Sequence, residues 1–293
     1  MADDQFDALC DGPLAPALAG LETARKQAVQ RFWVIMGAGA VVAVAAIVLT
    51  RFGVLGWVIA IFAILGGWIF ASMPMSKASR SLKDPALQAI GEARGFTHTP
   101  DGFIADGYEP LHPLLGRPNS RQFRDRFHGE HEGQPFVFYE ANLVSGSGKS
   151  RREVFNGLIY SLKRRPVQGE TVIVPDRGLF NWVKPGSGME RVRFEDDEAF
   201  EKKFEVYSTR PDEARGLINP VVRQQLKTWR EAHGKILVRI AGDDITAAFS
   251  GKGDRFEPGS MMKSIPGRER VRAMWNDLEQ AFDHLRQVRQ TLG

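Results

Sequence analysis

Two histidines and a glutamate lie close together in the segment His128-Gly129-Glu130-His131. Imidazole and carboxylate groups can ligate a metal or transfer protons. A helical zinc site needs its two histidines four residues apart, whereas these are three apart, and neither a cysteine nor a second acidic cluster supplies further ligands. We interpret the segment as a solvated turn, and keep His128 and His131, with Arg215, as the first candidates if the chain is an enzyme.

The segment 145–150, Ser-Gly-Ser-Gly-Lys-Ser, resembles a phosphate-binding P-loop. That motif needs a glycine where this chain has Leu143, and it must open a helix whose N-terminal amides cradle phosphate. Strand-forming residues lie on both sides of the segment instead. The sequence therefore predicts a flexible hairpin tip, whose cations Lys149, Arg151 and Arg152 could contact phospholipid headgroups.

Two polar segments further along invite functional interpretations. The acidic run 195–198 lacks the glycine and spaced ligands of a calcium loop, so we expect Asp196 or Asp197 to cap a helical turn toward Phe200. Between Tyr207 and Pro220, we expect a polar corner that fixes a strand to a helix, with a ligand site at Arg215 as the alternative. No Gly-x-Ser-x-Gly elbow is present. We therefore predict no catalytic, cofactor-binding or metal-ligating residue and no cofactor.

Two apolar stretches, 33–50 and 52–73, are expected to anchor the chain in a membrane. The first has no ionisable residue and as a helix covers about 27 Å of hydrocarbon. A cleaved signal peptide would begin with basic residues, whereas an acidic leader precedes this stretch. The two stretches predict a transmembrane hairpin with its turn at Arg51.

More cations flank the hairpin on one side than on the other, which sets its expected orientation. Three precede the first span and three follow the second, while Arg51 lies alone in the turn: Arg25, Lys26, Arg31, Lys77, Arg80 and Lys83. Because Lys and Arg near span ends are retained in the cytoplasm, both termini should be cytoplasmic. Lys77, Arg80 and Lys83 are expected to contact anionic lipid headgroups.

Small residues form a stripe along each span and allow helices to approach closely in lipid. The positions are Gly39, Ala43 and Ala46, and then Gly53, Gly56, Ala60, Ala63, Gly67 and Ala71. Packing of the hairpin on itself is the simpler interpretation, and a face for a homo-oligomer or a partner's helix is the alternative. Because neither span carries an ionisable residue, the hairpin indicates an anchor and not a transport path.

The remaining part of the chain is long enough for one substantial core. Residues 84–293 carry 32 Lys and Arg against 30 Asp and Glu, so the pI of 9.2 does not indicate a nucleic-acid partner. The single cysteine excludes an intrachain disulfide framework and suits a reducing cytoplasm.

An α+β fold, mainly antiparallel, is expected after an irregular connector over 102–118. Asp84 and Pro85 should start a short helix that ends at Gly95, and Asn219 and Pro220 should start one that runs to about Ala232. The expected strands are 122–128, 134–140, 154–162, 170–174, 191–194, 204–207, 236–240 and 245–249.

The C-terminal segment has the most regular pattern in the chain. Apolar residues recur every seven positions and predict an amphipathic helix of more than twenty residues: Val271, Leu278, Leu285 and Leu292, interleaved with Met274, Ala281 and Val288. We expect this helix to pack across the sheet, with a coiled-coil contact to a second chain as the alternative.

Several segments together resemble a known family. They are Phe127 to Phe136, Thr171 to Asp176, Val192 to Glu195, and Phe204 to Ser208 followed by Glu213-Ala214-Arg215. In this order, and after a membrane hairpin, they are similar to the bacterial membrane proteins of the DUF3137 family over roughly residues 30 to 290. The resemblance implies a bacterial membrane location and a soluble α+β domain, and it implies no activity.

The sequence thus predicts a leader (1–30), a transmembrane hairpin (31–75), a basic juxtamembrane segment and connector (76–118), and a cytoplasmic domain (119–293) whose sheet could curl into a barrel or PH-like sandwich. The expected location is the bacterial inner membrane. The expected function is a membrane-anchored binding or scaffold module for a protein partner or lipid headgroups. The less favoured alternative is a membrane-tethered enzyme with a site at the sheet edge.

Overall fold

The computed structural model describes residues 2–176, 188–251 and 255–293, which divide into two compact units. The hairpin unit consists of residues 1–93 and 256–278, and the sheet unit consists of residues 94–255 and 279–293. Helix α8 (Gly267–Leu292) contributes residues to both units. The predicted α+β class is confirmed: two long apolar helices come first, followed by an antiparallel sheet and a C-terminal helix.

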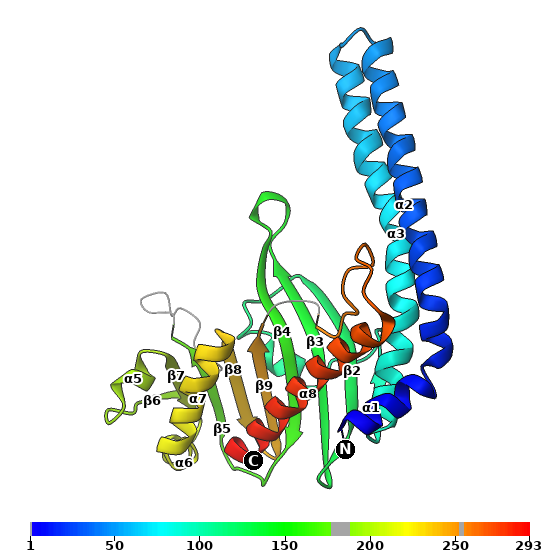
Figure 1. Ribbon diagram of the computed structural model, residues 1–293. Helices are drawn as coiled ribbons and strands as arrows, with labels where there is room; N and C mark the ends of the chain where they lie inside the picture. Colours follow the sequence, from blue (N-terminus) through cyan, green and yellow to red (C-terminus); the bar gives the residue numbers. More distant parts are fainter. Residues whose placement is uncertain (1, 177–187, 252–254) are drawn as a thin grey trace. The chain divides into compact units, whose positions relative to one another are not determined.

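Two antiparallel helices dominate the hairpin unit, α2 (Ala15–Leu49) and α3 (Val54–Glu92), and they lie side by side in Figure 1. They are preceded by α1 (Ala2–Asp11), which the acidic leader forms. The predicted turn lies at Arg51 and Phe52, which adopt left-handed backbone angles with φ of 51° and 62°. Thr50 ends α2 by donating its hydroxyl hydrogen to the carbonyl oxygen of Ala46 at 2.8 Å.

The apolar side chains near this turn are uncovered. Leu49 is 82% exposed and Val54 is 81% exposed, and many other large apolar residues of both helices are exposed as well. A continuous apolar surface of this size is costly in water and is normal in hydrocarbon. Both helices are long and apolar enough to cross a membrane.

The small residues of the two helices meet each other. A Cβ atom added at Gly39 would lie 3.1 Å from the carbonyl oxygen of Ala63, and one added at Gly56 would lie 2.8 Å from that of Ala46. Ala43, Ala60 and Ala71 are also buried. The stripe thus serves packing of the hairpin on itself, which was the simpler of the two interpretations.

Replacing Gly39 by isoleucine is expected to destabilise the hairpin by about 2 kcal/mol, because the side chain would push against the α3 backbone. Thermal unfolding of the full chain in detergent micelles, followed by circular dichroism, measures this change. Gly37→Ile is the matched control, since a Cβ atom there meets nothing within 4 Å. Equal melting temperatures for the two variants would contradict close packing at Gly39.

Helix α3 corrects one prediction from the sequence. Asp84 and Pro85 do not start a new helix, because α3 continues through both Pro74 and Pro85 as far as Glu92. A proline inside a helix removes one hydrogen bond and costs about 3 kcal/mol. Around Pro85 the helix buries Leu82, Ala86, Leu87 and Ile90 completely, and this burial offsets the cost.

Residues 256–266, which we call the clasp, are held by buried cations from three helices of the hairpin unit. The guanidinium of Arg270 in α8 donates to the backbone carbonyls of Pro258, Gly259, Ser260, Lys263 and Ile265 at 2.6 to 3.2 Å. Lys83 of α3 pairs with Glu257 at 2.5 Å, and Arg25 of α2 donates to the carbonyl oxygen of Met261 at 3.4 Å. Each of these three cations is buried.

The sheet unit is built on one antiparallel sheet in the order β1-β2-β3-β4-β9-β8-β5-β7-β6. The strands are β1 (Phe96–Thr99), β2 (Ser120–His131), β3 (Gln134–Ser145), β4 (Arg152–Lys163), β5 (Glu170–Pro175), β6 (Glu190–Val192), β7 (Phe204–Ser208), β8 (Ile236–Ala241) and β9 (Asp244–Ser250). All eight predicted strands are present, with ends shifted by a few residues. The sheet does not close, so the barrel, one of the forms into which the sheet could curl, is wrong. The outermost strands, β1 and β6, are short and pair on one side only among the described residues.

Short helices connect these strands. They are α4 (Tyr108–Leu111) in the connector, η1 (Gly148–Ser150) at the β3–β4 tip, α5 (Glu198–Glu201), α6 (Pro211–Leu217) and α7 (Pro220–His233). The predicted start of α7 is confirmed, because the Asn219 side chain accepts hydrogen bonds from the amides of Val221 and Val222.

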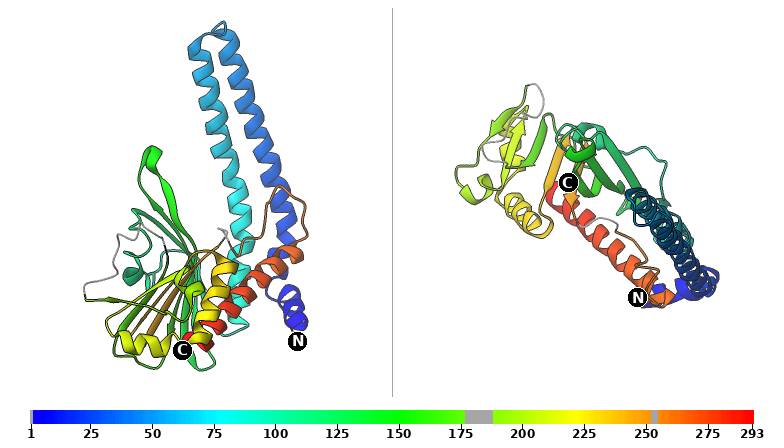
Figure 2. Two further views of the ribbon diagram at one scale, coloured as in Figure 1. Left: turned by 90° about the vertical axis from the view of Figure 1, so that its left-hand side faces the viewer. Right: turned by 90° about the horizontal axis from the view of Figure 1, so that it is seen from above.

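One face of the sheet, which we call the helix face, is covered by α7 and by residues 279–292 of α8, as Figures 1 and 2 show. Phe282 of α8 packs against Phe96, Phe136 and Phe138. Trp229 of α7 donates its indole hydrogen to Gln287 of α8 at 2.9 Å. The expected packing of the C-terminal helix on the sheet is thus present, and its apolar stripe is buried within the chain.

The opposite face, which we call the pocket face, has a core of its own. Tyr139, Leu143 and Ile159 from the central strands pack there with Tyr108 and Leu115 from the connector. This core covers only part of the pocket face and leaves a hollow beside it.

Two histidines under the helices make the sheet unit sensitive to acid. The rings of His233 and His284 lie 4.4 Å apart and both contact Phe249. Burial, then His233 and Arg255, lower the pKa of His284 to about 4, while Asp283 opposes the shift. Burial and Arg255 also lower the pKa of His233.

Acid is therefore expected to destabilise the sheet unit. Because folding lowers the pKa of His284 from 6.5, the unfolded chain binds more protons, so stability is full above pH 6.5 and falls toward pH 4. The loss from His284 is about 2 kcal/mol at pH 5. Denaturant unfolding at pH 7.5 and 5 measures it. Between pH 7.5 and pH 5, the free energy of unfolding of His284→Gln should fall less than that of the wild type. His112→Gln changes a histidine outside the cluster, and its free energy of unfolding should fall as much as that of the wild type.

Candidate functional site

Three polar side chains form a row across the middle of the pocket face. Ser161 on β4 is the register partner of Thr246 on β9, and Thr246 is the partner of Arg239 on β8. Directly paired residues of an antiparallel sheet project to the same face, and neighbouring strands lie about 4.8 Å apart. We call these three residues the donor row.

The donor row has unused hydrogen-bonding capacity. Arg239 uses its Nε to bind Glu170 at 2.6 Å, and within the described part of the chain its two terminal amino groups donate to no protein acceptor. The hydroxyl groups of Ser161 and Thr246 likewise have no protein partner among the described residues, although Thr246 is 2% exposed. A covered group with spare donors is available to bind a ligand or ordered water.

The donor row lines a pocket of about 420 Å³ on the sheet unit. Apolar groups form part of its wall: Pro110, Pro135 and Val137. Val137 on β3 extends the row by one strand, because it is the register partner of Ser161. The pocket therefore places hydrogen-bond donors next to apolar surface, which is the usual composition of a small-molecule site.

The loop at Asp106 and Gly107 closes one side of the pocket. Gly107 has a left-handed φ of 74°, and a Cβ atom there would lie 2.9 Å from the side chain of Thr246 and 3.5 Å from that of Ser161. The Tyr139 hydroxyl donates to the carbonyl oxygen of Asp106 at 2.9 Å, and burial raises the pKa of this phenol. Only a residue without a side chain allows the loop to approach the donor row this closely.

Charged residues of both signs line the pocket. Lys163 pairs with Asp243 at 3.1 Å and with Asp244 at 2.8 Å. Asp106 accepts from Arg126 at 3.0 and 2.9 Å through a single oxygen atom, Oδ2. Asp106, Lys163, Arg239 and Asp244 all belong to the lining, so two positive and two negative side chains face the same space.

The two predicted histidines lie within β2 and not in a solvated turn, which corrects the expectation for residues 128–131. The turn falls at Glu132 and Gly133, because β2 extends to His131. His128 is the register partner of Val137, while His131 contacts Phe282 under α8, so the two rings lie on opposite faces. Burial and Arg126 lower the pKa of His128, and burial lowers that of His131.

The predicted headgroup contacts are exposed with one exception. Lys77 and Arg80 are exposed on α3, whereas Lys83 is buried and paired with Glu257, which removes it from the set of available cations. Lys149, Arg151 and Arg152 are exposed around η1 at the β3–β4 tip, where the P-loop-like segment forms a hairpin end as predicted. Lys149, Arg151 and Arg152 therefore lie near one another at this tip.

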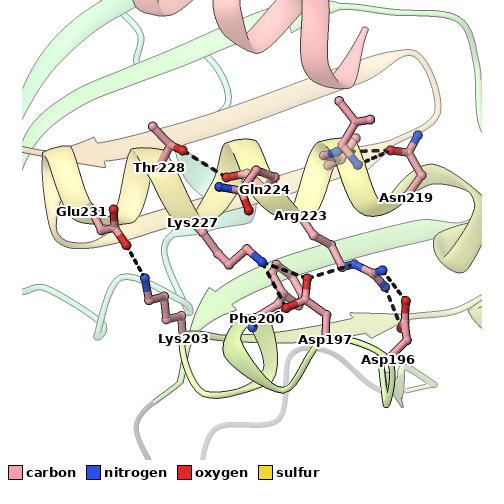
Figure 3. A network of polar contacts seen from close by, with 12 residues as sticks. Asp196, Asp197, Phe200, Lys203, Asn219, Arg223, Gln224, Lys227, Thr228 and Glu231 are labelled. Carbon is pink, nitrogen blue, oxygen red and sulfur yellow. Dashed lines mark hydrogen bonds and ion pairs between the residues drawn. The ribbon is translucent and has the colours of Figure 1, made fainter.

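Two residues of the acidic run, Asp196 and Asp197, pair with cations of α7, as Figure 3 shows. Asp197 caps α5 by accepting from the amide of Phe200 at 3.0 Å, as predicted, and it also binds Lys227 at 3.0 Å. Asp196 pairs with the buried Arg223 at 2.5 Å. Among the described residues, no three His, Cys, Asp or Glu side chains form a group that could hold a metal ion.

The polar corner between β7 and α7 is a structural element. Glu213 of α6 accepts from the backbone amides of Gln168 and Gly169 at 3.0 and 2.7 Å, which lowers the pKa of its carboxyl group. The side chain of Arg215 is 52% exposed and pairs with Asp212 at 2.7 Å. Arg215 therefore lies at the surface, apart from the residues that line the pocket.

Sequence reasoning missed the donor row, although each member carries a signal. Ser161, Thr246 and Arg239 are polar residues inside apolar strands, at positions where alternation places them opposite the residues of the helix face. The β8–β9 hairpin is predictable from Gly242, and its register pairs Arg239 with Thr246. Only the pairing of β9 with β4, which are far apart in sequence, brings in Ser161.

No curated protein matches the chain. Among solved structures, the mycobacterial trehalose monomycolate transport factor A, TtfA, is similar with a TM-score of 0.36 and 15% sequence identity, over 68% of this chain and 94% of that chain. A likeness at this level carries no argument about function. Residues 153–289 match the model of the family described as "Protein of unknown function (DUF3137)", and the resemblance to that family predicted from the sequence is confirmed over these residues.

Proposed function

We propose that this chain is a membrane-anchored binding module whose sheet unit binds the phosphate-bearing headgroup of a membrane lipid. One observation carries the proposal: Ser161, Thr246 and Arg239 offer adjacent donors without protein partners inside a pocket that is also lined by apolar groups. The hairpin would keep this unit at the membrane.

The donor row suits a phosphate group for a geometric reason. Arg presents its N–H donors in a planar fork that matches two phosphate oxygens, and hydrogen bonds between charged partners are about twice as strong as neutral ones. Two hydroxyl groups on the neighbouring strands can donate to further oxygens. The apolar wall at Val137 and Pro135 suits the glycerol and first acyl carbons that follow a headgroup.

The proposal includes the bacterial inner membrane as location, with both termini in the cytoplasm. In that orientation the exposed cations Lys77 and Arg80, and those of the β3–β4 tip, Lys149, Arg151 and Arg152, would add attraction to anionic lipid. Each such cation is worth about 1 kcal/mol near the surface. These contacts would concentrate lipid, while the pocket would select the headgroup.

The geometry gives less support to the enzyme alternative. Along the row, Ser161 is separated from His128 by Val137, which places their strands about 10 Å apart. A serine needs a base within about 3 Å to become a nucleophile. His128 instead contacts Arg126 at 2.9 Å. A protein partner also receives little support, since the small-residue stripe and the apolar face of α8 are both filled within the chain.

The test is a titration of the full chain in detergent micelles with the short-chain lipids dihexanoyl phosphatidylethanolamine and dihexanoyl phosphatidylglycerol, read by native mass spectrometry. Arg239→Gln is expected to weaken binding by 10-fold to 100-fold, because it removes a charged hydrogen bond worth about 1.5 to 3 kcal/mol. Thr246→Val keeps the side-chain shape and should weaken binding by a factor of about 5.

Matched controls lie outside the pocket. Arg286→Gln on α8 and Thr228→Val on α7 remove the same chemical groups from positions that do not line the pocket and should leave affinity unchanged. If neither lipid binds the wild type, the proposed function is rejected. If the lipids bind but Arg239→Gln and Thr246→Val bind equally well, the headgroup site lies elsewhere.

A further inference from the structure

We infer that the pocket takes a zwitterionic headgroup, a phosphate ester that carries a primary ammonium group, as in phosphoethanolamine. This inference rests on the proposed function. It adds that the ligand carries a positive charge, on its ammonium group, as well as the negative charge of the phosphate. It comes from the carboxylates of the pocket, which the phosphate proposal does not use.

The charge of the lining is balanced. Arg239 and Lys163 are matched by Asp106 and Asp244, so the four side chains together are neutral. Both carboxylates already pair with cations, Asp106 with Arg126 and Asp244 with Lys163, so a ligand with a net negative charge would add a charge that the lining does not balance. A ligand that carries one charge of each sign can pair with both kinds of group.

The positions of the charges define two ends. Arg239 on β8 lies at one end of the donor row, and the Asp106–Arg126 pair lies toward β2, beyond Val137 on β3. The loop at Gly107 holds Asp106 against the row through its close approach to Ser161 and Thr246. A phosphate at Thr246 and Arg239 therefore leaves the rest of the headgroup directed toward Asp106.

Asp106 has capacity for an ammonium group. Both of its hydrogen bonds from Arg126 reach Oδ2, and within the described part of the chain Oδ1 accepts from no protein donor. Its side chain is 41% exposed and lines the pocket. A primary ammonium has three N–H donors and can bind this oxygen, whereas a quaternary choline has none. The site should therefore distinguish ethanolamine from choline as well as from glycerol.

The experiment compares three short-chain lipids that differ only in the headgroup, on the full chain in detergent micelles: dihexanoyl phosphatidylethanolamine, phosphatidylcholine and phosphatidylglycerol. The wild type is expected to bind the ethanolamine lipid about 10-fold more tightly than the other two. Asp106→Asn should reduce binding of the ethanolamine lipid to the level of the choline lipid and leave binding of the glycerol lipid equal or stronger. Asp283→Asn, which removes an exposed carboxylate on α8, should preserve the preference.

Each failure has its own signature. Equal binding of the three lipids, unchanged in Asp106→Asn, overturns the zwitterion inference and leaves the proposed function in place. Binding of none overturns both. Water-soluble glycerophosphoethanolamine serves as the lipid-free probe. If it binds as tightly as the lipid, the ligand is a free phosphodiester, and the membrane-lipid part of the proposed function is overturned while the zwitterion inference stands.

Discussion

Gly157→Ala is expected to unfold the sheet unit or to lower its stability by at least about 3 kcal/mol. Gly157 lies on β4 opposite Ser250 of β9, and a Cβ atom there would overlap the carbonyl oxygen of Phe249 and lie 2.8 Å from the Cα atom of Ser250. Relief of that overlap requires β4 and β9 to separate. These two strands join the two halves of the sheet, so their separation breaks it in the middle.

Denaturant unfolding of the full chain, followed by near-ultraviolet circular dichroism, measures this effect. Gly216→Ala in α6 is the control, because a Cβ atom there meets nothing within 4 Å. It should be neutral or stabilising by up to about 1 kcal/mol, as expected for alanine in a helix. A Gly157→Ala variant as stable as the wild type would show that the β4–β9 pairing is not as described.

Arg270→Met is expected to open the clasp. All five N–H donors of the guanidinium are directed to backbone carbonyls, and Arg270 is only 1% exposed. Methionine fills a similar volume but leaves buried acceptors without donors, at about 1 to 3 kcal/mol each. Amide hydrogen exchange in peptides that cover residues 256–266 should become at least 10-fold faster.

Arg268→Met is the matched control for the clasp. Arg268 lies two residues away on α8, its side chain is 49% exposed, and it pairs with Asp7 and Asp11 at 3.2 Å. Exposed pairs contribute about 0 to 1 kcal/mol, so exchange in the clasp should change little. Equal exchange rates in both variants would contradict a structural role for the hydrogen bonds from Arg270 to the clasp.

Local patterns in the sequence predicted the elements well. The Asn219-Pro220 pair marked the first turn of α7, and the apolar stripe from Val271 to Leu292 marked α8, because capping and periodicity act within a few residues. The failure at Pro85 has the opposite cause. The burial of Leu82 and Ile90 depends on tertiary packing, which a local rule for proline does not include.

Side-chain environments were predicted less well, for the same reason. His128 and His131 are close together in the sequence, but as residues of one strand their side chains project to opposite faces of the sheet. Lys83 has the sequence context of a lipid-facing cation, and its partner Glu257 is 174 residues away. The donor row needs the register of three strands at once. Long-range pairings of this kind leave no local signature.

The division of the chain into units has a consequence for the order of its synthesis. The hairpin unit is discontinuous: residues 256–278 complete it, and they are translated after every strand of the sheet. Chains fold from the N-terminus as they emerge, and a domain can form once its own residues are present. During translation, α2 and α3 therefore precede the clasp by residues 94–255, which hold every strand of the sheet. Until that segment arrives, Arg25 and Lys83 lack their partners in the clasp, so these two cations become buried only after every strand of the sheet has been made.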